Sequence, residues 1–285
     1  MPLERTLSTP DKLRLRAVLQ TATLAALMDS RRWQPGEIAF QGGTSLHLAH
    51  GSARFSEDLN FMVRGGLSVT GLAAQVRRKL RLPPDTPADL QVSVSSGKEP
   101  HNPHIFYVSL SGPAVLGSVK VKIELWQTDA AALESLNLKV STVTSSAGQA
   151  FVPTLTLEEI FADKVYALGA RKRIKARDIF DLWWLADKKV LSVPLEALRT
   201  RLAIYPLQGG AAGTAKAWLA NAELRLADLK APAAASVIAK DLKRWLPSSW
   251  PMDEAAALQM ISLSIIQLET GMQSMQTIVI KATSA

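Results

Sequence analysis

Residues 40–63 read FQGGTSLHLAHGSARFSEDLNFMV. This stretch places a glycine pair, Gly42 and Gly43, directly after a short apolar run, and an acidic segment follows further along. A turn without side chains lets backbone N–H groups approach a phosphate, and a helix N-terminus behind the turn favours negative charge. A glycine pair is also typical of an ordinary tight turn that needs a positive φ. These residues alone leave both interpretations open.

The acidic segment RFSEDLNF begins at residue 54. In extended backbone, Asp58 and Asn60 share one face of the chain, while Leu59 and Phe61 point to the other face. Oxygen-bearing side chains on a strand suit a Mg²⁺ ion that protein and phosphates hold jointly. A solvated edge strand is the alternative interpretation of the same pattern.

A second acidic strand is predicted later in the chain. Apolar and polar residues alternate in several segments over residues 90–126, which predicts strands of a sheet. In KVKIELW, residues 120–126, Glu124 falls on the polar face together with Lys122. A carboxylate from each of two strands could share the metals of a two-metal phosphoryl transfer.

The segment LEEIFADKVYALGARKRIKARDIFDL predicts two successive helices with a basic connection. Lys164 lies beside apolar positions, where a cation could reach a phosphate. Asp178 and Asp181 are three residues apart and therefore share a helix face. The connection suits nucleic-acid phosphates, and a solvated basic loop with helix-capping aspartates is the alternative. We take the RNA-binding residues to be Arg171, Lys172, Arg173, Lys175 and Arg177.

Length and composition set the limits of the interpretation. The 285 residues are 47% hydrophobic, enough for the core of one large or two ordinary domains. The formal net charge of +8 favours a polyanionic or phosphorylated partner. The absence of cysteine excludes disulfides, thiolate metal sites and cysteine nucleophiles. Because neither a signal-peptide core nor an apolar run of about 20 residues is present, we expect no membrane association and a cytoplasmic location.

Helix and strand signals divide the chain into two parts. A helix is predicted over residues 11–28, EIAF predicts a short buried strand, and TSLHLAHG predicts a two-turn helix with Thr44 or Ser45 as its N-cap. From residue 154 onward the signals are helical, although the tail after Pro251 gives no clear prediction. We therefore expect an α+β fold, with a mixed region over residues 1–153 and a mainly helical domain over residues 154–285. Such layouts often bind a ligand in a groove that the second domain completes.

Four segments in this order resemble the AbiEii/AbiGii family of toxin nucleotidyltransferases, which includes the MenT toxins and belongs to the polymerase-beta-like superfamily. The first is GGTSLHLAHGSARFSEDLNF, with the glycine pair and the acidic strand, and the second is KVKIELW, with the second acidic strand. The third is DKVYAL, with the lysine, and the fourth is RIKARDIFDLWWL, with an arginine and two aspartates. Four motifs in one order are more specific than any one of them.

The resemblance implies a polymerase-beta-like nucleotidyltransferase core, a mixed sheet with helices, followed by the helical domain. It implies a toxin of a toxin–antitoxin or abortive-infection system that uses Mg²⁺ and transfers a nucleoside monophosphate from an NTP to RNA. The acceptor it favours is the 3′ end of tRNA, a modification that blocks translation. The implied partners are tRNA or another RNA and a cognate antitoxin protein. Transfer to a protein acceptor and a weakened relative that only binds nucleotide or RNA are the alternatives.

The family pattern also implies roles for the residues that match its motifs. Asp58 would hold Mg²⁺, Lys164 would contact the triphosphate, and Asp178 would lie near the nucleotide or the attacking hydroxyl. The implied catalytic residues are Asp58, Glu124, Lys164 and Asp178, and the implied metal ligands are Asp58, Asn60 and Glu124. The implied nucleotide-binding residues are Gly42, Gly43, Thr44, Ser45, Arg54, Ser56 and Asp181.

Asn60 departs from the family pattern, which has a second acidic residue at this place. An amide can still offer a carbonyl oxygen to Mg²⁺, but it lacks the charge that helps to hold the ion. The sequence leaves three explanations open. The chain is a natural variant that works with Glu124, a weakened or repurposed enzyme, or a form substituted so that a toxic protein can be produced.

Overall fold

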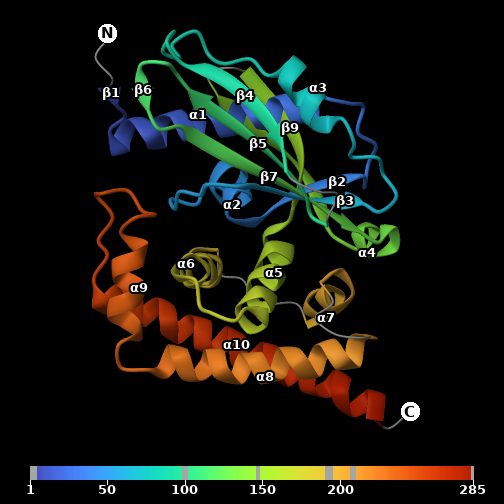
Figure 1. Cartoon of the computed structure of the whole chain (residues 1–285). Coiled ribbons are helices and arrows are strands. Elements are labelled where there is room, and N and C mark those ends of the chain that lie inside the picture. The colour runs from blue at the N-terminus through green and yellow to red at the C-terminus, as the bar shows by residue number, and fades with distance from the viewer. Residues whose placement is uncertain (1–4, 98–101, 146–147, 190–194, 206–209, 284–285) are drawn as a thin grey trace. The chain divides into compact units, whose positions relative to one another are not determined.

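The computed structural model describes residues 5–97, 102–145, 148–189, 195–205 and 210–283 of a chain that divides into two compact units (Figure 1). The first unit comprises Met1–Ala49, Glu57–Glu134 and Leu138–Thr154. The second comprises His50–Ser56, Ser135–Asn137 and Leu155–Ala285. The helical unit thus includes two short segments that precede its helices by many residues in the chain.

A mixed sheet forms the centre of the first unit. Its strands are β2 (Ile38–Gln41), β3 (Leu59–Arg64), β4 (Gln91–Ser96), β5 (His104–Ser111), β7 (Val119–Thr128), β8 (Leu138–Ser145) and β9 (Gly148–Leu155). Their order across the sheet is β4-β5-β7-β3-β2-β9-β8. Strand β3 runs parallel to β7 and antiparallel to β2. A separate two-stranded sheet pairs β1 (Arg5–Thr6) with β6 (Val115–Leu116).

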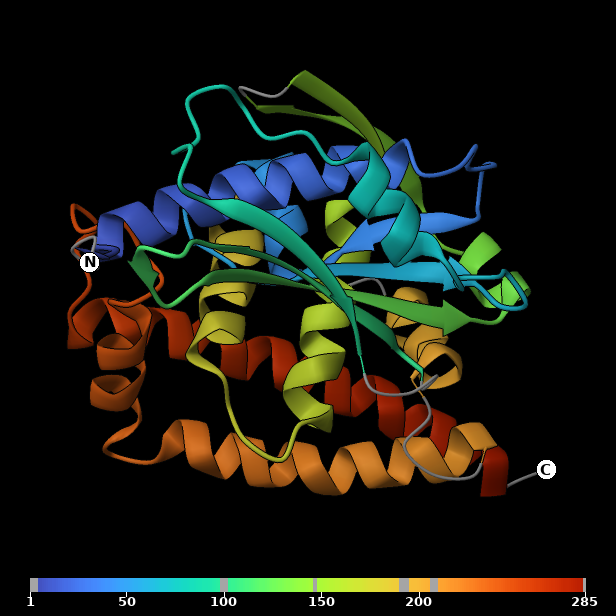
Figure 2. The same ribbon diagram turned by 45° about the horizontal axis from the view of Figure 1, so that its top comes forward.

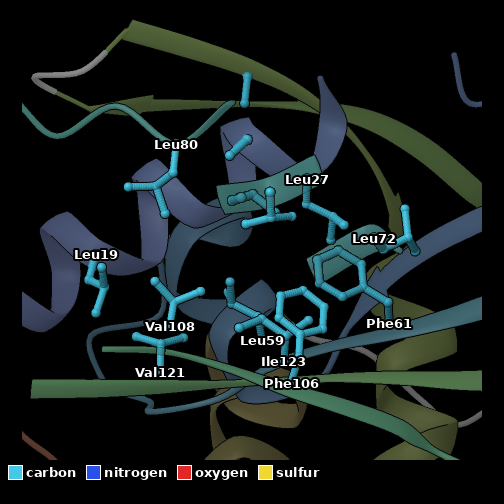
Figure 3. Packing of buried hydrophobic residues seen from close by; sticks show 14 of the residues in the cluster. Leu19, Leu27, Leu59, Phe61, Leu72, Leu80, Phe106, Val108, Val121 and Ile123 are labelled. Atoms are coloured by element: carbon cyan, nitrogen blue, oxygen red, sulfur yellow. The ribbon is translucent and has the colours of Figure 1, made fainter. Parts of the chain in front are cut away.

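Helices cover the apolar face of this sheet. Strand β7 alternates as its sequence predicts, with Val121 and Ile123 fully buried and Lys122 and Glu124 partly exposed on the opposite face. Helices α1 (Thr9–Met28) and α3 (Leu72–Lys79) pack against each other, and α1 also contacts β5 and β7 (Figure 2). Figure 3 shows Leu19 and Leu27 of α1 and Leu72 of α3 in one cluster with Phe61, Phe106, Val121 and Ile123 from the strands.

The first helix begins earlier than its apolar spacing predicts. Helix α1 starts at Thr9 instead of Asp11, because Ser8 forms a capping box with Asp11. The Asp11 backbone N–H donates to Ser8 Oγ at 3.2 Å, and the Ser8 backbone N–H donates to the Asp11 carboxylate at 3.3 Å. These two bonds satisfy donors that a helix N-terminus would otherwise leave without partners.

The second unit is built from helices. They are α5 (Leu157–Ala170), α6 (Ala176–Trp183), α7 (Leu195–Ile204), α8 (Gly210–Lys230), α9 (Ala234–Leu242) and α10 (Glu254–Thr283), with a π-helical turn at Trp184–Lys188. Helix α10, which the sequence leaves unpredicted, contacts each of the other five helices. Its buried residues, such as Ala257, Ile261 and Leu268, follow helical spacing on one face. The exposed face also carries large apolar residues, Leu258, Ile266 and Ile280, which blur the apolar stripe in the sequence. Within the described residues, no helix is both long and apolar enough to span a membrane.

Two buried side chains fix α5 in this unit. The Trp218 indole of α8 is fully buried and donates to the Tyr166 carbonyl at 2.8 Å. Arg201 of α7 is also fully buried and pairs with Glu159 Oε2 at 2.7 Å and Asp163 Oδ1 at 2.6 Å. The α+β prediction is therefore confirmed, with a mixed sheet and a mainly helical C-terminal region.

Candidate active site

Each unit carries one group of the predicted site residues. The first unit holds the glycine turn and the two acidic strands, and the second holds Arg54, Ser56 and the residues of α5 and α6. Ser56 lies partly exposed in the His50–Ser56 segment.

The glycine pair forms the junction between β2 and α2 (Gly42–His50). Gly42 has a φ of 78°, a conformation that L side chains rarely adopt. A β-carbon on Gly42 would also lie 3.2 Å from Asn60 Nδ2. The predicted N-cap at Thr44 or Ser45 is wrong, because the positive φ at Gly42 lets the chain enter the helix directly from the strand.

Two hydroxyl groups of α2 are buried behind this turn. Thr44 Oγ1 donates to the Asp58 backbone carbonyl, so it joins the turn to the acidic segment. Ser45 is fully buried, and its Oγ has no hydrogen-bond partner among the described residues. Gly43 is buried beside them. Next to the turn there is therefore a buried hydroxyl for which the described residues provide no hydrogen-bond partner.

Asp58, Asn60 and Glu124 come together at the junction of β3 and β7. Asn60 pairs with Glu124 in the parallel register and with Gln41 in the antiparallel one. Asp58 directly precedes β3. Its neighbour Glu57 is held by α1, whose Gln20 Nε2 donates to the Glu57 carbonyl at 3.0 Å.

The ammonium group of Lys122 contacts both carboxylates. Lys122 Nζ lies 2.7 Å from Glu124 Oε1 and 3.3 Å from Asp58 Oδ2. Burial alone would lower the pKa of Lys122, but the bonds and charges of Glu124 and Asp58 outweigh it and raise the pKa. The sequence places Lys122 on the face of Glu124, yet its contact with Asp58 depends on the β3–β7 register, which local spacing does not reveal.

The residues of this group fit a divalent cation. One positively charged atom already contacts a carboxylate oxygen of Asp58, just before β3, and one of Glu124 in β7, as a shared metal ion would. No group of three or more histidine, aspartate or glutamate side chains with metal-binding geometry occurs in the part of the chain that the structure describes. Two carboxylates and an amide match the way proteins hold Mg²⁺, which keeps water or phosphate oxygens as its other ligands.

The helical unit assembles five predicted residues into one ion-pair network. Asp181 receives a bidentate pair from Arg54, at 2.7 Å from Nε and 2.8 Å from Nη2, and it contacts Lys164 Nζ at 2.7 Å. Lys164 Nζ also lies 3.0 Å from Asp178 Oδ1, and Arg171 contacts the other oxygen of Asp178. Arg54, Lys164, Asp178 and Asp181 are all buried.

The charges of this network are unequal. Three cations face two carboxylates, so one positive charge remains when all five groups are ionised. Burial would raise the pKa of Asp181, but Arg54 and Lys164 outweigh burial and lower that pKa to about 2. The pKa of Lys164 is lowered by burial and by the charges of Arg54 and Arg171, despite the opposing effect of Asp181. A buried group with surplus positive charge favours an anionic ligand.

The five basic residues at the end of α5 and the start of α6 separate into two sets. Arg171 is bound to Asp178, and the Arg177 guanidinium lies 4.1 Å from the ring centroid of Trp245. The exposed set consists of Lys172, Arg173 and Lys175. The stacking on Trp245 was not predicted, because Arg177 and Trp245 are far apart in the sequence.

Comparisons with known proteins identify the family of the chain. A sequence model of the family described as nucleotidyl transferase AbiEii toxin, type IV TA system, matches residues 26–258, which is more than half of the chain. No curated protein matches the chain.

Two solved structures share the fold. JHP933 from Helicobacter pylori is 18% identical, with a TM-score of 0.53 over 98% of this chain and 100% of that one. MenT4, a nucleotidyltransferase toxin from Mycobacterium tuberculosis, is 15% identical, with a TM-score of 0.56 over 93% of this chain and 87% of that one. Because the family model matches most of the chain, the chain belongs to the AbiEii family of nucleotidyl transferase toxins of type IV toxin–antitoxin systems.

Proposed function

We propose that this toxin is a Mg²⁺-dependent enzyme that transfers a nucleoside monophosphate from an NTP to the 3′ end of an RNA, with tRNA as the acceptor. The observation that carries the proposal is that Asp58, just before β3, and Glu124 of β7 both contact one cation, the ammonium of Lys122. Family membership supplies the reaction class and implies an antitoxin partner. The use of Mg²⁺, the RNA acceptor and the roles of individual residues are the parts that we propose.

In this proposal Asp58 and Glu124 hold Mg²⁺, with the amide oxygen of Asn60 as a neutral ligand. When bound, the ion offsets the charge of the triphosphate and of the oxygens that attack and leave. Backbone N–H groups at Gly42 and Gly43 and the buried hydroxyl of Ser45 would donate to phosphate oxygens. The unsatisfied Ser45 Oγ supports this role, because a buried hydroxyl without a partner is unfavourable unless a ligand completes it.

The helical unit would supply positive charge to the same reaction. Lys164 contacts the triphosphate, Arg54 and Asp181 fix Lys164, and Asp178 is a catalytic residue near the nucleotide or the attacking hydroxyl. The 3′-hydroxyl oxygen loses its proton to solvent and bonds to the α-phosphorus, the bond from the α-phosphorus to the oxygen bridging to the β-phosphorus breaks, and pyrophosphate leaves. The surplus positive charge of the network supports this assignment, since pyrophosphate is a strongly anionic leaving group.

The exposed basic residues of the loop before α6 would bind the RNA backbone. Lys172, Arg173 and Lys175 are exposed and present positive charge to solvent. Phosphate contacts of this kind position RNA without reading its sequence.

Incubation of the protein with tRNA and each α-labelled NTP tests the proposal. Label in RNA is expected with at least one NTP, and Asp58→Asn and Glu124→Gln should each reduce incorporation by about 100-fold or more, as loss of a charged transition-state contact does. No label in RNA from either the wild-type protein or Asn60→Asp would contradict it. Label in a polypeptide instead would identify a protein acceptor.

Asn60 favours one competing function, in which the protein binds nucleotide or RNA but does not transfer a nucleotide. In that case growth arrest on expression would survive the Asp58→Asn substitution. A Mg²⁺–nucleotide complex that fails to raise the thermal stability of the protein would count against the enzyme, since a ligand of the native state must stabilise it.

A further inference from the structure

The strongest unassigned feature of the first unit is the ammonium group between its two carboxylates. Lys122 lies two residues before Glu124 on β7, so the strand itself places both side chains on one face. The Nζ atom is nearer to Glu124 than to Asp58, at 2.7 Å against 3.3 Å. This atom takes the position from which a metal ion would contact both acids.

The net charge of the site disfavours a metal ion as long as Lys122 contacts the two acids. With Asn60 in place of an acid, two carboxylates face one ammonium, and only one negative charge remains. A divalent ion next to a bound ammonium would be repelled, since both are positive and only a few ångströms apart. The ion can therefore bind well only when the ammonium has moved away.

The side chain of Lys122 is free to make that movement. Its exposed fraction is 32%, and the lysine stem carries several rotatable bonds below a compact charge. Displacement from the carboxylates leaves the ammonium without an anion unless a new one arrives. A triphosphate that enters with the ion supplies one.

We propose that Lys122 is a positioning residue that fills the metal position between Asp58 and Glu124 in the nucleotide-free protein and transfers to the triphosphate when the ion binds. Metal alone then binds weakly, because it must displace a favourable ion pair. Metal together with triphosphate binds strongly, because the displaced ammonium gains a partner. This inference rests on the proposed function, in which the two acids hold the ion.

Calorimetry on Lys122→Met tests the proposal with two probes, Mn²⁺ alone and Mg²⁺ with inorganic tripolyphosphate. Mn²⁺ alone should bind the variant about tenfold more tightly than the wild type, and Mg²⁺–tripolyphosphate about tenfold more weakly. We expect the same two shifts in Lys122→Gln, which removes the charge but keeps a polar side chain. Lys122→Arg keeps the charge and should restore the wild-type order of the two affinities.

Lys120→Met is the matched control. Lys120 lies on the same strand and face, but its Nζ lies over the Tyr107 ring, 3.7 Å from the centroid, and contacts neither acid. Both affinities should stay within about twofold of the wild type. Opposite shifts in Lys122→Met that are absent in Lys120→Met support the proposal.

An unchanged Mn²⁺ affinity in Lys122→Met, or affinities for both probes that move in the same direction, would overturn it. The RNA-labelling experiment separates this result from the proposed function. If the wild-type protein labels RNA but the affinities do not shift as stated, only the role of Lys122 fails. If the affinities shift as stated and no RNA is labelled, the proposed transfer fails while Lys122 keeps its role.

Discussion

The side-chain amide of Asn60 lies against Gly42, with Nδ2 only 3.2 Å from the position that a β-carbon on this glycine would occupy. The glycine turn and the acidic strand therefore meet at a contact that no larger residue could make without displacement. The same turn has a φ of 78°, so Gly42 is required both for its backbone conformation and for space.

Gly42→Ala should lower the free energy of unfolding by about 2–3 kcal/mol, because it combines a positive φ with the contact to Asn60. Gly66 has the same φ of 78° but nothing within 4 Å of its β-carbon position. Gly66→Ala should therefore show only the conformational part, about 1–2 kcal/mol. Chemical denaturation of both variants measures the difference, and equal losses would show that the contact with Asn60 is unimportant.

Asp181→Asn should remove part of the pH dependence of stability. The pKa of Asp181 falls from 3.8 to about 2 on folding, so its carboxylate stabilises the native protein above pH 3.8. This contribution, about 2 kcal/mol, is lost as the pH falls through the range between these values. The stability gap between the wild type and the variant should therefore shrink by about this amount from pH 6 to pH 2.5.

Denaturant unfolding at the two pH values gives the measurement. Asp187→Asn is the control, because Asp187 lies in an exposed pair with Lys188 at 3.0 Å. The difference in free energy of unfolding between Asp187→Asn and the wild type should be small at both pH values. A gap for Asp181→Asn that does not change with pH would contradict the prediction.

Arg201→Met should destabilise the helical unit by about 3–5 kcal/mol, because it leaves Glu159 and Asp163 as buried acids without their guanidinium. Burial already raises the pKa of Asp163 despite the opposing charge of Arg201. Thermal or denaturant unfolding measures the loss. Lys230→Met breaks an exposed pair with Glu269 and should cost less than about 1 kcal/mol. Similar losses in both variants would contradict the role of burial.

A double substitution, Lys172→Ala with Arg173→Ala, should weaken tRNA binding. It should also reduce the slope of log affinity against log salt concentration by about two in magnitude. Both residues are exposed, so the fold should be unaffected. Lys216→Ala, exposed on α8, is the control and should change neither quantity. Binding titrations at several salt concentrations give the slope, and an unchanged slope would show that these two residues do not contact RNA.

The sequence predicts the structure best where apolar residues recur at a regular spacing, because that spacing determines which side chains are buried. Strand β7 alternates as predicted and places Glu124 on its polar face. The glycine pair, the acidic segment and the lysine helix were recognised because their motifs are local. Helix α10 is not predicted, because its exposed face carries the apolar residues Leu258, Ile266 and Ile280, which hide the one-sided pattern on which helix prediction depends.

Contacts between distant segments could not be predicted in the same way. Arg54 and Asp181 are 127 residues apart, and nothing in their spacing shows that they form a buried bidentate pair. The contact of Lys122 with Asp58 likewise depends on the pairing of β3 with β7. The family resemblance named Arg54, Asp181 and Asp58 as site residues, but their partners became visible only in three dimensions.

The placement of residues 50–56 in the helical unit limits how this protein can be divided. A cut after residue 153 would leave Arg54 in the N-terminal fragment and its partner Asp181 in the other one. The C-terminal fragment would then bury Asp181 without its guanidinium partner, with Lys164 left in contact with it, so this fragment should be less stable than the helical unit of the whole chain. Any exchange of the helical unit between relatives would therefore have to carry residues 50–56 along with α6, although the two lie far apart in the chain.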